Sequence, residues 1–182
     1  ERLTARALKL NEAILGPFHP QTAESLFDMA VLYRITGRFG QARQYASRSL
    51  EAREMVFGAN HPLVAKSLEQ VALAHVQQAE WSAAEKAARR ALAIVEATLG
   101  PDSIETAGPL NTLGEARRQS GRLTEAIPLY GKALEVMERT YGPGDLRTAM
   151  LLNNLGGAYA QAGRLAEAEP YLRRALAVHE RF

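Results

Sequence analysis

Histidine is the residue type in this chain best suited to bind a metal ion or to move a proton near neutral pH. His19 and His61 each precede a proline, and they lie 42 residues apart in the sequence. Equivalent positions on neighbouring helices are about 8–10 Å apart, which is too far for both to bind one zinc ion through bonds of about 2 Å. We therefore expect both side chains to cap the helices that follow them, and we expect His75 to be packed or partly exposed. No metal site is predicted.

A glycine-rich segment and several carboxylates are the other candidates for chemistry. Residues 142–147 read GPGDLR, which begins like a dinucleotide-binding loop but lacks the third glycine and follows a helical pattern instead of a strand. The sequence contains no G-x-S-x-G, H-E-x-x-H or G-K-[ST] motif. Arg or Lys residues three or four positions from the carboxylates indicate solvated helix faces; these carboxylates include Glu51, Glu85, Glu135 and Glu169. We predict that the chain is not an enzyme, with no catalytic residue and no cofactor.

The composition excludes further classes of protein. The 22 Lys and Arg residues nearly balance the 20 Asp and Glu residues, and no block of like charge occurs. Interleaved Glu on the arginine-rich helices, without an aromatic stacking platform, argues against a nucleic-acid partner. The longest segment without a charge, residues 148–163, contains three amides, so no membrane span is predicted. Because there is no Cys, we expect a cytoplasmic location. Glu1 at the first position suggests a fragment of a larger multidomain protein.

Internal repetition is the strongest pattern in the sequence. Gly16, Gly58, Gly100 and Gly142 recur at intervals of 42 residues, and such a period is typical of stacked repeats. We predict one array of residues 1–182, with repeats at 16–57, 58–99, 100–141 and 142–182, and with 1–15 as the second helix of a partial repeat. Both ends fall inside a repeat, so we expect the array to continue, with partners for Leu3, Leu8, Ile14, Leu176 and Val178.

Each repeat reads as two helices. Apolar residues recur at spacings of three and four, as on one face of an amphipathic helix, and Gly-Arg pairs such as Gly37-Arg38 separate the two stripes. The pattern predicts helices near 1–15, 20–36, 40–57, 62–78, 82–99, 103–120, 124–141, 145–162 and 166–182, and no strand. Ser82 and Thr124 are predicted to cap second helices. Pro128 and Pro170 are predicted to bend theirs slightly.

These features resemble the tetratricopeptide repeat family, in the 42-residue form typical of kinesin light chains. The resemblance covers the whole chain and is carried by segments such as HPQTAESLFDMAVLYRITGRFGQA and RTAMLLNNLGGAYAQAGRLAEAEPYLRRALAVHE. Departures from the pattern are Ala79-Glu80 in place of Gly-Arg, and His75 and Arg117 in place of Tyr. The resemblance implies an all-α, right-handed solenoid of stacked antiparallel helix pairs. It also implies a protein–protein interaction scaffold.

The same resemblance implies that inward positions of the first helices form a peptide-binding groove. In the first two repeats these positions include Phe27, Asp28, Val31, Arg34, Lys66, Gln70 and Leu73. In the last two they include Asn111, Thr112, Arg118, Asn153, Asn154 and Gln161. The first half therefore offers apolar patches and the second half offers amides, which suit the backbone of an extended peptide. Arg34, Lys66 and Arg118 are candidates to meet acidic residues of a ligand.

Other interpretations of these surfaces stay open. Several groove residues could merely solvate an empty surface, and the partner could be another domain of the parent chain. Self-association through exposed repeat ends, or by gripping a second copy, is the alternative function. Five glutamates recur every 42 residues near the ends of second helices, where the helix dipole disfavours them: Glu12, Glu54, Glu96, Glu138 and Glu180. We expect them to pair with a neighbouring Arg or with free N–H groups; an acidic binding stripe is the alternative.

Overall fold

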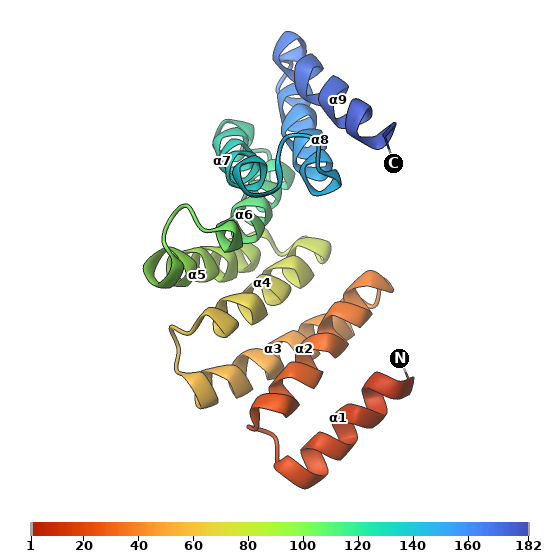
Figure 1. The fold of residues 1–182 in the computed structure, drawn as a ribbon, viewed down its shortest axis with the longest axis vertical. Coiled ribbons are helices and arrows are strands. Elements are labelled where there is room, and N and C mark those ends of the chain that lie inside the picture. The colour runs from red at the N-terminus through yellow and green to blue at the C-terminus, as the bar shows by residue number, and fades with distance from the viewer. Residues whose placement is uncertain (1, 182) are drawn as a thin grey trace. The chain divides into compact units, whose positions relative to one another are not determined.

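The computed structural model describes residues 2–181, which form nine α-helices and one 3₁₀-helix with no strand (Figure 1). The helices are α1 (Arg2–Leu15), α2 (Pro20–Ile35), α3 (Phe39–Phe57), α4 (Pro62–Gln77), α5 (Trp81–Leu99), η1 (Ile104–Thr106), α6 (Ala107–Gln119), α7 (Leu123–Tyr141), α8 (Leu146–Gln161) and α9 (Leu165–His179). The predicted all-α fold of antiparallel helix pairs is confirmed. Even-numbered helices are the first helices of the repeats, and odd-numbered ones are the second helices.

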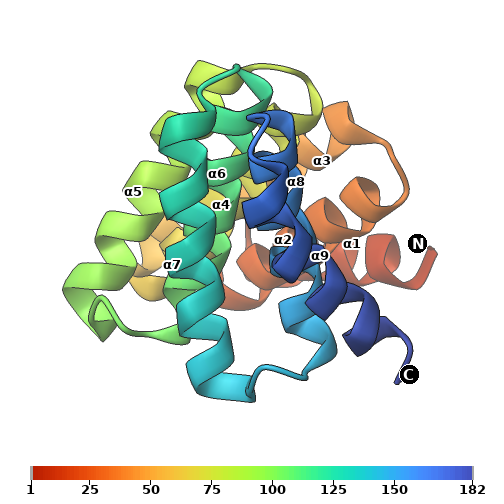
Figure 2. The same cartoon turned by 90° about the horizontal axis from the view of Figure 1, so that it is seen from above.

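The helices fall into two compact units, unit 1 up to Thr98 and unit 2 from Leu99 onward. In unit 1, α2 packs between α1 and α3, and α3 also packs on α4. In unit 2, α6 packs on α7, α7 on α8, and α8 on α9 (Figures 1 and 2). The first helices of successive repeats also touch, α2 with α4 and α6 with α8. Those contacts place neighbouring first helices on a common surface within each unit.

One predicted helix was wrong in its first turn. The pattern predicted a continuous helix over 103–120, but η1 occupies residues 104–106 and α6 begins at Ala107. Pro109 favours the later start, because proline has no N–H to donate and its ring clashes with the carbonyl four residues earlier, although α7 and α9 remain continuous around Pro128 and Pro170. A start at Ala107 puts Pro109 in the first turn, where no N–H is required.

The helix caps are confirmed for the two histidines. His19 Nδ1 accepts the N–H of Gln21 at 3.2 Å, and His61 Nδ1 accepts the N–H of Leu63 at 3.1 Å. The predicted caps at Ser82 and Thr124 were wrong, because α5 begins at Trp81 and α7 at Leu123. The chain is already helical one residue before each hydroxyl.

The apolar core of unit 1 joins Leu8 of α1 to residues of α2 and α3, among them Leu26, Met29 and Tyr33. Leu8 and Val178 are each only 4% exposed, so the expectation that these two need partners outside the chain was wrong. Leu3, Ile14 and Leu176 are exposed, as expected. Pro128 and Pro170 lie on exposed positions inside α7 and α9; the bends remain a prediction.

Three of the recurring glutamates pair with an arginine 36 residues later, which confirms the expected structural role for them. Glu54 binds Arg90 at 2.5 Å, and the same register joins Glu12 to Arg48 and Glu138 to Arg174. Each pair links one second helix to the next. Because all three pairs are partly exposed, each contributes about 0–1 kcal/mol. Across residues 2–181, no helix is both long and apolar enough to cross a membrane.

Candidate binding surfaces

Unit 1 has a shallow hollow of about 370 Å³ beside α1. Its lining comes from α1 and α2 and consists of Thr4, Phe27, Asp28, Val31, Leu32 and Ile35. We call it the α1–α2 hollow. Three of the predicted groove residues, Phe27, Asp28 and Val31, therefore meet at one place. The structure does not bring Lys66, Gln70 or Leu73 to this hollow; they lie on α4.

The charged groups of unit 1 are partly engaged with one another. Arg34 Nε donates to Gln70 Oε1 at 3.0 Å, which joins α2 to α4. Burial raises the pKa of the Glu69 carboxyl, although the cations of Arg34 and Lys66 oppose the shift. Burial also raises the pKa of Asp28. This surface therefore carries charges of both signs, and desolvation disfavours the ionised form of the Glu69 and Asp28 carboxyls.

Arg53 is a buried neighbour of Phe27 that the sequence reasoning missed. Its side chain, 2% exposed, donates to the Leu63 carbonyl at 3.0 Å, to Ser67 Oγ at 3.1 Å and to Glu24 Oε2 at 2.5 Å. The guanidinium lies 4.5 Å from the centre of the Phe27 ring, within the range of a cation–π contact. Arg53 thus supports Phe27 from beneath the surface. The available signal was an arginine where the later repeats have Val95 and Met137.

Unit 2 presents amides, as predicted, but two of them bind each other. Asn154 Nδ2 of α8 donates to Asn111 Oδ1 of α6 at 2.8 Å, while Asn153 is exposed. Thr112 was wrong as a groove residue, because it is 1% exposed and its hydroxyl donates to the Gly108 carbonyl at 3.1 Å. It faces its own helix and cannot meet a ligand.

Arg118 is neutralised within unit 2. Its guanidinium donates to both oxygens of Glu115, at 3.1 and 2.7 Å, and to Gln161 Oε1 at 3.3 Å. Burial alone would raise the pKa of Glu115, but hydrogen bonds from Arg118, Gln119 and Tyr130 outweigh it and lower that pKa. Sequence reasoning did not find this ion pair, which leaves Arg118 less able to attract an acidic ligand.

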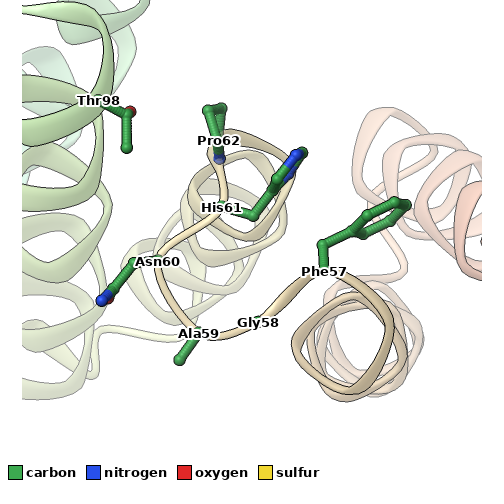
Figure 3. Close-up of a pocket in the computed structure, with 7 residues that line it drawn as sticks. All are labelled: Phe57, Gly58, Ala59, Asn60, His61, Pro62 and Thr98. Atoms are coloured by element: carbon green, nitrogen blue, oxygen red, sulfur yellow. The ribbon is translucent and has the colours of Figure 1, made fainter.

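A second hollow of unit 1 lies at the turn between α3 and α4 (Figure 3). Its lining is Phe57, Gly58, Ala59, Asn60, His61, Pro62 and Thr98. The Phe57 and His61 rings stack with centres 4.8 Å apart, and His61 Nδ1 is already occupied by the helix cap. In the part of the chain that the structure describes, no three His, Cys, Asp or Glu side chains gather as a metal site. We therefore interpret this hollow as part of the α3–α4 turn and not as a binding site.

Comparison with known proteins identifies what the repeats are similar to. The family model for the tetratricopeptide repeat matches residues 1–55, 28–97 and 105–181. Among solved structures, BtubC (BKLC) from P. vanneervenii is 21% identical with a TM-score of 0.81, covering 98% of this chain and 71% of its own. A Podosopora anserina protein described as a kinesin light chain with nearly identical TPR-like repeats is 18% identical with a TM-score of 0.77, covering 99% and 85%. No curated protein sequence matches.

Proposed function

Because the chain belongs to the tetratricopeptide repeat family, we propose that it binds an extended peptide, or a partner domain, on the exposed surface of its first helices. This proposal makes the chain a binding scaffold and not a catalyst. The partner is either a separate protein or another domain of the parent chain. A reducing, cytoplasmic compartment is part of the proposal, since the sequence contains no cysteine.

The observation that carries the proposal is the amide pair of unit 2. The hydrogen bond between Asn154 and Asn111 uses one donor and one acceptor, which leaves N–H groups on Asn111 and the carbonyl of Asn154 for a ligand. Asn153 precedes Asn154 on α8 and is exposed. Side chains held in place before binding lose less entropy when a ligand arrives. Such a row suits the alternating N–H and C=O groups of an extended backbone.

The test is calorimetry with a 12-residue peptide selected from a random library against the unaltered protein. Replacing Asn111 and Asn153 together by Ala should weaken binding by about 1–3 kcal/mol, since polar groups of the peptide lose their partners. Gln44→Ala is the control, because it removes an exposed amide from the second helix α3. Equal affinity of the double variant and the control, with helicity intact, would place the binding surface elsewhere.

Self-association is a second candidate, favoured by exposed apolar side chains on α9. Leu172 and Leu176 are one helical turn apart, and both are exposed. Apolar patches of this kind mark interaction surfaces when they are contiguous. Light scattering over a range of concentrations measures this directly: a mass that rises with concentration, and falls back in Leu172→Gln/Leu176→Gln, supports it. A constant monomer mass rejects it.

A further inference from the structure

Two glycines follow one another inside α8, and packing explains only the first of them. A Cβ added at Gly156 would lie 2.8 Å from Cγ and Cδ2 of Leu172, so that position has no room for a side chain. A Cβ added at Gly157, which is half-buried, would meet no atom of the described chain within 4 Å. Glycine inside a helix is less favourable than alanine, because it loses more conformational freedom on folding. Packing within residues 2–181 therefore does not account for the glycine at position 157.

The space above Gly157 faces α6. Asn154 of α8 donates to Asn111 of α6 at 2.8 Å, and Gln161 of α8 accepts from Arg118 of α6 at 3.3 Å. Gly157 lies three residues after Asn154 and four residues before Gln161, which puts it on the same face of the helix. We call the space above Gly157, between these two hydrogen bonds, the α6–α8 gap.

The other repeats carry a side chain at the position of this glycine. The residues 42, 84 and 126 positions before it are Glu115, Leu73 and Val31. In unit 1, Leu73 of α4 lies three residues after Gln70, which accepts a hydrogen bond from Arg34 of α2. Gly157 follows Asn154 at the same spacing in unit 2. A glycine thus opens the seam between two first helices at a position where unit 1 has a leucine.

The charges beside the α6–α8 gap are already paired. Arg118 and Glu115 form an ion pair at 2.7 Å. Glu115 also accepts hydrogen bonds from Gln119 and Tyr130, both at 2.7 Å. A charged side chain of a ligand would have to compete with this ion pair, and it would meet a like charge whichever sign it carried. The surroundings of the gap therefore favour an uncharged ligand group.

The two asparagines at one end of the gap can pair with a further amide. Their hydrogen bond uses Oδ1 of Asn111 and one N–H of Asn154, which leaves both N–H groups of Asn111 and Oδ1 of Asn154 for a ligand. A carboxamide has a carbonyl acceptor and N–H donors in one plane, so it can satisfy a donor and an acceptor that lie side by side. An apolar side chain would cover these groups without offering them a partner, which is unfavourable.

We propose that the α6–α8 gap receives one carboxamide side chain, Gln or Asn, of an extended peptide, and that Gly157 determines this specificity. The two hydrogen bonds that border the gap are seven residues apart on α8, or about 10 Å. Side chains on one face of an extended peptide recur about every 7 Å, so one of them fits between the two hydrogen bonds. Asn153 and the second N–H of Asn111 remain for the peptide backbone. This inference rests on the proposed binding of an extended peptide, and it names the side chain that unit 2 selects.

The experiment selects 12-residue peptides from a random library twice, once against the unaltered protein and once against Gly157→Leu, which fills the gap with the side chain found in unit 1. Peptides selected by the unaltered protein should share Gln or Asn at one position, and those selected by Gly157→Leu should not. Fluorescence anisotropy then compares the tightest such peptide with its version carrying Ala at that position. The change to Ala should weaken binding to the unaltered protein at least tenfold, and binding to Gly157→Leu less than twofold.

Gly131→Leu is the matched control. Gly131 is half-buried on the second helix α7, and a Cβ added there also meets no atom of the described residues within 4 Å. This variant should keep the tenfold difference between the two peptides. Circular dichroism checks the fold of each variant. Gly157→Ala, whose single methyl group has room, replaces Gly157→Leu if the leucine prevents folding, and it should reduce the difference between the peptides at least threefold.

The inference would be overturned by selected peptides without a shared Gln or Asn, or by a tenfold difference that persists in Gly157→Leu. A shared charged or apolar residue that responds to Gly157→Leu would assign the gap to another ligand group, and equal effects of Gly131→Leu and Gly157→Leu would remove the role of the gap. Either result also overturns the inference.

The variant Asn111→Ala/Asn153→Ala separates this inference from the proposed function. If it weakens binding of the selected peptide while Gly157→Leu leaves the preference for Gln or Asn unchanged, only the inference about the gap is lost. If neither variant affects binding, or if the selection yields no binding peptide, the extended-peptide surface of unit 2 is lost as well.

Discussion

At the scale of single residues, side-chain volume is matched between the two helices of each repeat. Gly114 of α6 faces Tyr130 of α7, and a Cβ added at Gly114 would lie 2.8 Å from Cε1 of that ring. Gly156 of α8 faces Leu172 of α9 in the same way. In the first two repeats the same two positions are both alanine, namely Ala30 with Ala46 and Ala72 with Ala88. A glycine therefore accompanies each large side chain.

Gly114→Ala should lower the free energy of unfolding by about 1–3 kcal/mol, because the fully buried Tyr130 ring has no room to move away. Gly157→Ala is the control, since a Cβ there meets nothing within 4 Å. It should instead stabilise α8 by about 0.5–1 kcal/mol, as expected for Ala in place of Gly within a helix. Urea unfolding followed by circular dichroism measures both. A loss of stability in both variants would refute the argument from volume.

Two aspartates should respond to pH with opposite signs. Hydrogen bonds from the side chain and the backbone N–H of Arg147 lower the pKa of Asp145 to about 2, whereas burial raises the pKa of Asp28. A lowered pKa stabilises the fold above the unfolded value of about 4, and that contribution is lost as the pH falls towards 2. A raised pKa has the opposite effect, and its relative stabilisation is lost as the pH rises.

The measurement compares melting temperatures of Asp145→Asn and Asp28→Asn with the unaltered protein from pH 6 to pH 2. Asp145→Asn should be less stable at pH 6, and the difference should shrink towards pH 2. Asp28→Asn should be more stable at pH 6, and its advantage should disappear in acid. Parallel pH profiles for the two variants would contradict these assignments.

The residue scale is also where the sequence was least informative. Its spacing located the caps at His19 and His61, because a cap depends only on the two or three residues that follow. Repeat register alone could not reveal that Thr112 turns back to its own helix, that Arg118 is held by Glu115, or that Asn111 meets Asn154. These contacts depend on the rotamer of each side chain and on a small rotation of its helix.

At the scale of elements, the turn of the second repeat is built differently from that of the first. Arg38 lies over the Tyr33 ring, 4.1 Å from its centre. The equivalent residues of the second repeat are Glu80 and His75, whose Oε2 and Nδ1 are 2.5 Å apart. Arg43 of α3 also binds Glu80, at 3.0 Å. An ion-paired turn thus replaces a stacked one, which accounts for two departures from the family pattern.

Ala79 in this turn adopts φ +58°, where the other repeats have glycine. A left-handed conformation costs a residue with a Cβ about 1–2 kcal/mol. Glycine avoids this cost, but part of the gain in stability is offset because glycine loses more conformational freedom when the chain folds. Ala79→Gly should therefore raise stability by about 0.5–1 kcal/mol. Gly121→Ala, the reverse change at the equivalent turn with φ +80°, should lower it by a similar amount. Thermal unfolding measures the change in stability of both variants, and a change of the same sign in both would refute the argument from backbone strain at Ala79.

The elements themselves were predicted well, since a hydrophobic period of 3.6 residues repeated four times leaves little freedom in where helices lie. The exception is the first turn of the third repeat, where Pro109 favours a helix start at Ala107. Hydroxyl residues near helix starts misled the prediction for α5 and α7. The Gly-Arg or Ala-Glu turn before each of these two helices already fixes the residue at which the helix begins.

At the scale of the whole molecule, a family of stacked repeats gains stability from each repeat and from its nearest neighbours. The described residues divide into unit 1 and unit 2, and both units contain buried apolar side chains. The contacts of Ala79 lie in unit 1 and those of Gly114 in unit 2. Mutations without shared partners should act independently. A separate question is whether unit 1 and unit 2 unfold in a single transition, and it has to be measured on the intact chain.

Trp81, the single tryptophan of the sequence, offers a way to measure this. It begins α5 in unit 1, so its fluorescence reports on unit 1, while circular dichroism reports on all helices. Because Ala79 lies in unit 1 with Trp81 and Gly114 lies in unit 2, we expect Ala79→Gly to move the midpoint of the Trp81 transition in guanidinium, and Gly114→Ala to move it much less. Circular dichroism should respond to both changes, with Gly114→Ala broadening the transition towards lower denaturant. If both variants shift the fluorescence and dichroism midpoints equally, the two units unfold together, and the nearest-neighbour coupling is strong enough to make the chain a single cooperative structure.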